Sequence, residues 1–284
     1  MEQHILMVPG PGDDQSRKLA YTEFGDANNP KVLFCVHGVS RCGRDFDAIA
    51  EALSDVYRVI CPDMAGRGGS DWLDDPAGYG MPVYLSDIKA LRKHVGAERI
   101  DWIGTSMGGL IGMVLASMGD KSPIDRMVMN DIGPFIPKES LQRISTYLGT
   151  TETFADVAAI EAYIRDVNAA FGPLTDPQWA FLASHSHRPA PDGNGLRLHY
   201  DPRIVEPFKA GSDEDADMWG IWDKVSCPTL VLHGSESDLL SKETVEEMTK
   251  RGPEADYHTF VGNGHAPALL DDEQISVVRN WLVG

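Results

Sequence analysis

Ser106 stands in a setting that is typical of a nucleophile. It lies within the hexapeptide GTSMGG at 104–109. A helical pattern, MGGLIGMVLASM, begins inside this hexapeptide at Met107 and continues to 118. Between a strand and a helix, a G-x-S-x-G sequence forms a turn so tight that the residues two positions either side of the serine must lack side chains. We therefore predict that Gly104 and Gly108 place Ser106 at the edge of a sheet and at a helix N-terminus, where free N–H groups favour negative charge.

A serine hydroxyl is a weak nucleophile unless a base removes its proton, so this hypothesis requires a histidine and an acid elsewhere in the chain. The expected order after such an elbow is serine, then Asp or Glu, then His. His265 follows the last apolar run, in the sequence NGHAP, and Asp238 follows the preceding run, in SESD. We therefore predict that His265 accepts the Ser106 proton and that Asp238 holds the imidazole in the required tautomer.

Asp131 is an alternative acid. It ends the apolar run MVMND and precedes a turn of Ile132, Gly133 and Pro134, which it could cap instead. From the end of that run it could also reach a histidine that follows a neighbouring strand. We prefer Asp238 because its place in the chain order is the usual one for this kind of elbow. Separate Asn substitutions at the two positions would decide between them.

An acyl-transfer site also needs hydrogen-bond donors for the negative oxygen that forms when a carbonyl is attacked. The backbone N–H of Met107, directly after the nucleophile, is one predicted donor. The loop HGVS at 37–40 follows the apolar run VLFCV, which makes the Val39 N–H the second predicted donor. Arg41 and Arg44 come just after this loop. They could contact an acidic group of a substrate, or they could be solvated or paired with nearby acids.

Short apolar runs that alternate with amphipathic stretches would position these residues. The runs are VLFCV (32–36), YRVIC (57–61), RIDWIG (99–104), IDRMVMND (124–131), CPTLVLHG (227–234) and DYHTFVG (256–262). Such alternation indicates βαβ units, and strands that are apolar throughout are typical of a parallel sheet covered on both faces. The sequence therefore predicts an α/β fold with a mostly parallel sheet. The N-terminal pieces HILMVPG and KLAYTEFG are predicted to be a hairpin or edge strands.

The alternation stops between residues 134 and 216. This segment has helical patterns at 140–148, 155–171 and 176–185 but no clear strand pattern, and it is dense in Pro and Gly. A helical insertion in a parallel α/β chain predicts a lid over one edge of the sheet. We therefore divide the chain into a catalytic core, 1–133 plus 217–284, and a helical lid, 134–216.

The composition argues against several classes of partner. Lys and Arg total 25 against 43 Asp and Glu, and the resulting charge of −18 is unfavourable for binding nucleic acid or anionic lipid. We find no sequence pattern for a signal peptide, a membrane span or a nucleotide cofactor. His185, His187 and His199 lack a familiar zinc spacing, so no metal is predicted. Four scattered cysteines fit a reduced compartment, and a cytoplasmic location is expected.

Together these segments resemble the α/β-hydrolase fold family. HGVS, DMAGRGGSDW (63–72), GTSMGG, SESD and GNGH occur in the family's order, and the resemblance covers nearly the whole chain. Thr105 is a departure, since many members carry His or Asn there. The resemblance implies an eight-stranded, mostly parallel sheet flanked by helices, with a lid inserted at 134–216. It also implies a triad of Ser106, Asp238 and His265, with oxyanion donors from Val39 and Met107.

The function implied by the resemblance is that of a cofactor-free serine hydrolase. We expect it to cleave small to medium carboxylic esters through an acyl-enzyme on Ser106. Hydrolysis of C–C bonds, opening of lactones and cofactor-free haloperoxidase chemistry use the same triad and stay open, as does a ligand-binding role without catalysis. The acidic residues at 213–215 and Asp217 predict that neutral esters are preferred to anionic ones. The oligomeric state is left open.

Overall fold

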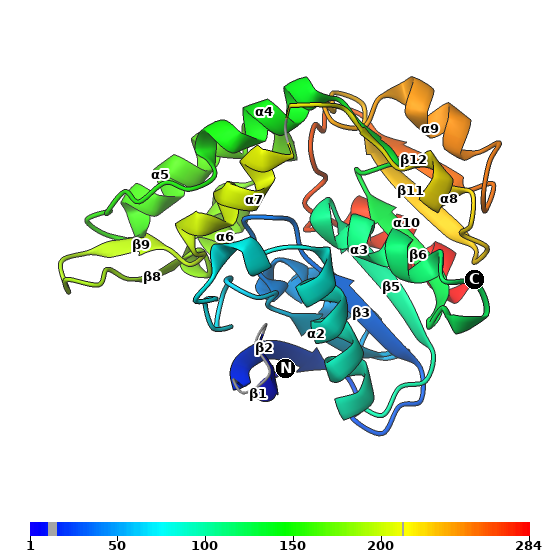
Figure 1. Cartoon of the computed structure of the whole chain (residues 1–284), viewed down its shortest axis with the longest axis horizontal. Coiled ribbons are helices and arrows are strands. Elements are labelled where there is room, and N and C mark those ends of the chain that lie inside the picture. The colour runs from blue at the N-terminus through cyan, green and yellow to red at the C-terminus, as the bar shows by residue number, and fades with distance from the viewer. Residues whose placement is uncertain (11–15, 212) are drawn as a thin grey trace.

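An eight-stranded sheet forms the central layer of the protein (Figure 1). The computed structural model describes residues 1–10, 16–211 and 213–284. The strands are β1 (Glu2–Pro9), β2 (Ser16–Phe24), β3 (Val32–Val36), β4 (Arg58–Pro62), β5 (Ile100–Thr105), β6 (Ile124–Asn130), β11 (Thr229–Gly234) and β12 (Asp256–Phe260). Their order across the sheet is β1-β2-β4-β3-β5-β6-β11-β12. β2 pairs antiparallel with β1 and β4, and all the other pairings are parallel, so the predicted sheet is confirmed.

Both faces of the sheet are covered, and β3 shows how. Val32, Phe34 and Val36 pack into one hydrophobic cluster, while Leu33 and Cys35 pack into another, because successive side chains of a strand point to opposite faces. The first cluster includes residues of α2 (Met81–His94), α3 (Met107–Ala116), α8 (Trp219–Trp222) and α9 (Lys242–Met248). The second includes residues of α1 (Asp47–Leu53) and α10 (Asp272–Val283). This two-sided burial explains why the run VLFCV contains no polar residue.

The N-terminal pieces form a hairpin, as predicted. Glu2 pairs with Glu23 at the open end, and Pro9 pairs with Ser16 at the other. Within the described ranges no helix is both long and apolar enough to span a membrane. The described chain also contains short 3-10 helices at Gly43–Phe46, Pro76–Gly78, Gly119–Lys121, Ala169–Phe171 and Pro202–Ile204.

The segment 134–216 is mainly helical and gathers above one end of the sheet in Figure 1. Its helices are α4 (Lys138–Tyr147), α5 (Val157–Val167), α6 (Asp176–Ser184) and α7 (Val205–Ala210). It also holds strands that the sequence analysis did not predict, in the pairs β7 (Phe135–Ile136) with β10 (Ala216–Asp217) and β8 (His187–Pro189) with β9 (Leu196–Leu198). Because β7 pairs with β10, the two ends of the segment lie side by side.

The candidate site residues follow parallel strands. Ser106 comes directly after β5 and Asp131 directly after β6, whereas His265 lies a few residues beyond β12. The carboxyl ends of parallel strands meet at one edge of a sheet, so these loops gather there. The segment 134–216 contacts the loop after β3, where Arg41 Nη1 donates to Ser186 Oγ at 3.0 Å, and the loop after β12, where Asn263 Nδ2 donates to the Phe171 carbonyl at 2.7 Å.

Candidate active site

Ser106 joins β5 to α3 in a backbone conformation that is rare for residues other than glycine. Its φ is 51° and its ψ is −114°. A Cβ at Gly104 would lie 2.3 Å from the Gly108 carbonyl carbon, and a Cβ at Gly108 would lie 1.9 Å from the Val36 carbonyl oxygen. Both flanking positions therefore require glycine, and the predicted tight turn is confirmed. The turn leaves Ser106 only partly buried, at the first residue before the helix.

His265 lies between Ser106 and a carboxylate. Its Nε2 is 3.0 Å from Ser106 Oγ, and its Nδ1 is 2.9 Å from Asp131 Oδ2. The histidine side chain is 10% exposed and the Asp131 side chain is fully buried. The structure therefore brings together a serine, a histidine and an aspartate in hydrogen-bonding sequence, which is the arrangement that activates a serine nucleophile.

Asp131 is held by donors from several directions. Its Oδ1 accepts a hydrogen bond from the Gly234 N–H at 2.8 Å, and its Oδ2 accepts one from the Ser237 hydroxyl at 2.6 Å. Its own N–H donates to the Leu232 carbonyl, and its φ of 53° turns the side chain out of the line of β6. A buried carboxylate costs free energy unless such donors compensate for lost water. These contacts keep both oxygens in place for His265.

The prediction that Asp238 lies beside His265 is wrong. The Asp238 side chain is 49% exposed and forms an ion pair with Arg143 of α4, in which the Nη2–Oδ1 distance is 2.9 Å. The physical reason is the course of the loop after β11. Ser237 points inward to Asp131, and Leu239 and Leu240 are buried, so Asp238 between them points outward to α4. Asp131 takes the place beside His265 that the sequence analysis gave to Asp238.

The loop after β3 lies against the nucleophile. A Cβ at Gly38 would lie 3.7 Å from the Ser106 Cβ, and Val39 is the next residue of the same loop. Met107 begins α3, and its N–H is one of the first helical donors without a carbonyl partner inside the helix. The two residues thus occupy positions that suit the predicted oxyanion role. That role itself stays a prediction.

Two buried side chains, neither of them singled out from the sequence, brace this loop. His37 Nδ1 donates to the Gly38 carbonyl at 2.7 Å, while its Nε2 accepts the Met64 N–H at 3.0 Å. Burial lowers the pKa of His37 to about 3, so the ring is neutral and can do both at once. Arg67 donates from Nε to the Val39 carbonyl at 2.9 Å. The only sequence signal for Arg67 is its place in the glycine-rich loop 63–72.

Arg41 and Arg44 are both paired with acids close by in sequence. Arg41 donates from Nε and Nη2 to the two oxygens of Asp45 at 2.7 and 2.8 Å, and its side chain is only 9% exposed. Arg44 donates from Nε to Asp47 at 2.8 and 2.9 Å. Each guanidinium therefore already has a counterion within the protein, which weakens the prediction that either one attracts an anionic substrate.

Comparison with known proteins places this geometry in a family. Residues 31–272 match the family described as the alpha/beta hydrolase fold. The chain is 42% identical over 274 residues to the 3-hydroxybutyrate-oligomer hydrolase of Cupriavidus necator, covering 94% of this chain and 93% of that protein. A crystal structure of a Rickettsia typhi protein superposes with a TM-score of 0.92 at 32% identity, covering 100% and 99% of the two chains. The crystal structure of an alpha/beta hydrolase from Novosphingobium aromaticivorans superposes with a TM-score of 0.86 at 34% identity, and the match covers 99% of this chain and 98% of that chain.

Proposed function

Because the chain belongs to the α/β-hydrolase fold family, we propose that this hydrolase is a serine esterase, in which Ser106 attacks the carbonyl carbon of a carboxylic ester. The observation that carries this proposal is the pair of hydrogen bonds through His265, at 3.0 Å to Ser106 and 2.9 Å to Asp131. A general base must lie within hydrogen-bond reach of the proton that it takes, and Nε2 of His265 does.

The mechanism follows from these contacts. The Nδ1–H of His265 donates a hydrogen bond to Asp131, so Nε2 carries no proton and can accept that of Ser106 as Oγ bonds to the ester carbon. The negative oxygen of the tetrahedral intermediate is stabilised by the N–H groups of Val39 and Met107. Collapse of the intermediate expels the alcohol, which takes its proton from His265. Water, deprotonated by His265, then attacks the acyl-enzyme and releases the acid.

The proposed substrate class is the ester of a short hydroxy acid. This step is supported by the relative from Cupriavidus necator, whose name states that it hydrolyses 3-hydroxybutyrate oligomers, and by its coverage of nearly the whole chain at 42% identity. Such a substrate is a small molecule joined by carboxylic ester bonds, so its cleavage needs only the serine chemistry above and no cofactor. The segment 134–216 serves as the lid of this site in the proposal.

Covalent labelling tests the proposal. A fluorophosphonate probe is expected to label the wild-type protein at Ser106, with peptide mass spectrometry identifying the site, and to leave Ser106→Ala unlabelled. Trimers of 3-hydroxybutyrate are expected to yield monomer and dimer with the wild-type protein, and Ser106→Ala is expected to lose about 10⁶-fold in turnover. A lactone and a vinylogous diketone run beside them separate ester hydrolysis from lactone and C–C chemistry. A protein that neither labels nor cleaves any of these esters would contradict the proposal.

A further inference from the structure

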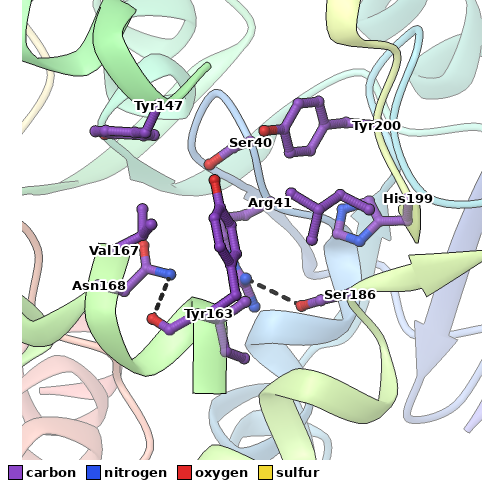
Figure 2. Close-up of a pocket in the computed structure, with 11 residues that line it drawn as sticks. Ser40, Arg41, Tyr147, Tyr163, Val167, Asn168, Ser186, His199 and Tyr200 are labelled. Atoms are coloured by element: carbon purple, nitrogen blue, oxygen red, sulfur yellow. Dashed lines mark hydrogen bonds between the residues drawn. The ribbon is translucent and has the colours of Figure 1, made fainter. Parts of the chain in front are cut away.

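A small cavity lies next to the loop that carries Val39, between this loop and the segment 134–216 (Figure 2). Ser40, the residue after Val39, lines it from the loop, and Tyr163 of α5 and Tyr200 line it from the segment. The same loop contacts the nucleophile through Gly38. Ser40, which lines the cavity, is therefore the residue directly after a proposed oxyanion donor.

Hydroxyl groups gather in this cavity. Figure 2 shows the hydroxyl ends of Tyr163 and Tyr200 directed toward that of Ser40, and no hydrogen bond joins any of the three to the other pocket residues drawn there. Burial raises the pKa of both phenols, with Tyr163 also raising the pKa of Tyr200, so both hydroxyls stay protonated and can donate at neutral pH. A ligand oxygen placed among them would gain hydrogen bonds that the pocket residues do not supply to one another.

The size and lining of the cavity limit what can enter. The space open to the centre of a water-sized group is about 20 Å³, which is room for roughly one such group. Ile164, Val167 and Leu198 add an apolar wall. Arg41 also borders the cavity, but its charge is matched by Asp45, so the site does not favour a carboxylate. A single hydroxyl group meets these conditions, and a long alkyl chain does not.

We propose that this cavity binds the hydroxyl of a short β-hydroxyacyl group, through Ser40, Tyr163 and Tyr200, and thereby selects hydroxyacyl esters over alkyl esters. The inference rests on the proposed function, because it places the ester carbonyl at the N–H groups of Val39 and Met107. The β-hydroxyl is carried by the second carbon from that carbonyl, and Ser40, which lines the cavity, directly follows Val39 in the loop.

The selection arises because an alkyl ester offers no hydroxyl to the side chains of Ser40, Tyr163 and Tyr200. A site that hydrogen-bonds a substrate hydroxyl discriminates against the analogue that lacks it, because those hydrogen bonds are then not formed. We expect kcat/KM for p-nitrophenyl 3-hydroxybutanoate to exceed that for p-nitrophenyl butanoate by at least about ten-fold. Tyr163→Phe and Tyr200→Phe should each lower this ratio by about three- to ten-fold, since each removes one neutral hydrogen bond.

The matched control is Tyr257→Phe on β12, where the tyrosine is 51% exposed and remote from the cavity lining, and it should keep the wild-type ratio. Thermal unfolding of all variants checks that each is folded. Equal kcat/KM for the two esters, or Tyr→Phe variants that lower both values equally, would overturn the inference while leaving the esterase proposal intact. If neither ester is cleaved and the fluorophosphonate does not label Ser106, the proposed function fails instead, and the inference fails with it.

Discussion

Two neighbouring strands, β6 and β11, each lead into an acidic residue, and the two residues have opposite surroundings. Asp131, directly after β6, is fully buried and bonded to His265, Gly234 and Ser237. Asp238, four residues after β11, is about half exposed and bonded to Arg143. Both follow parallel strands at the same edge of the sheet, so the edge alone does not decide which acid meets the histidine.

This contrast between Asp131 and Asp238 indicates that the loop after β11 supports the acid, Asp131, and does not itself supply the acid. The last residue of β11 donates the Gly234 N–H to Asp131, and the loop itself donates the Ser237 hydroxyl. The Ser237 oxygen in turn accepts the N–H groups of Leu239 and Leu240 at 3.2 and 3.1 Å, which fixes the direction of its own hydroxyl. With Ser237 turned inward, Asp238 is left on the outer side of the loop.

The largest effect is expected from Asp131→Asn. Asparagine tolerates the positive φ of this position, but its NH₂ group cannot accept the Nδ1 proton of His265, which favours the wrong tautomer. We expect kcat for ester hydrolysis to fall by about 10⁴-fold. Steady-state kinetics on a p-nitrophenyl ester measure the loss, with circular dichroism as the check on folding. A loss of less than ten-fold in a folded variant would contradict the role of Asp131 as the acid beside His265.

Ser237→Ala should have an intermediate effect. It removes a 2.6 Å hydrogen bond to the same Asp131 oxygen that faces His265, and hydrogen bonds to charged groups are stronger than neutral ones. We expect kcat to fall by about ten-fold. Ser235→Ala is the matched control, because Ser235 lies in the same loop and is exposed, and its hydroxyl accepts the Gly262 N–H rather than contacting Asp131. Equal losses in the two variants would mean that the loop and not the hydrogen bond matters.

Asp238→Asn should change kcat by less than about three-fold, because the side chain faces Arg143 and solvent rather than His265. The same assay and ester as for Asp131→Asn make the two values directly comparable. A loss of a hundred-fold or more at Asp238 would restore the acid that the sequence analysis preferred.

The smallest effect concerns stability. The Asp238–Arg143 pair joins the β11 loop to α4 with both side chains nearly half exposed, at 49% and 43%. Exposed ion pairs contribute about 1 kcal/mol or less and are screened by salt. We expect Asp238→Asn to lower the free energy of unfolding by no more than that in 50 mM NaCl, and by nothing measurable in 1 M NaCl. Urea denaturation at the two salt concentrations measures the free energy of unfolding. A larger loss that does not depend on salt would contradict an exposed, screened ion pair.

The sequence predicts the sheet and two members of the hydrogen-bonded site, Ser106 and His265, because their signals are local. Ser106 is marked by glycines that the turn requires, and VLFCV is marked by apolar residues on both faces of a strand. The choice of acid depends on a non-local fact. β6 pairs with β5 and β11, and β11 pairs with β12, so Asp131 and Asp238 both follow strands that lie between those of Ser106 and His265. The inward turn of Ser237 distinguishes the two acids.

The segment 134–216 shows the same limit. Its helices α4, α5 and α6 are predicted near their observed positions, and α4 and α5 carry a clear helical period of apolar residues. The strands β7 to β10 are two or three residues long, too short for a period-two pattern to register. Nor does any local pattern indicate that Arg67 reaches back to the Val39 carbonyl, since this contact joins residues 28 positions apart.

The most direct test of the central claim is to observe the proton between His265 and its acid. In protein labelled with ¹⁵N-histidine, proton NMR should show one strongly deshielded imidazole N–H, as expected for an Nδ1 proton shared with the carboxylate of Asp131 at 2.9 Å. This signal is expected to disappear in Asp131→Asn and to remain in Asp238→Asn. A signal that survives in Asp131→Asn and is lost in Asp238→Asn would contradict this expectation.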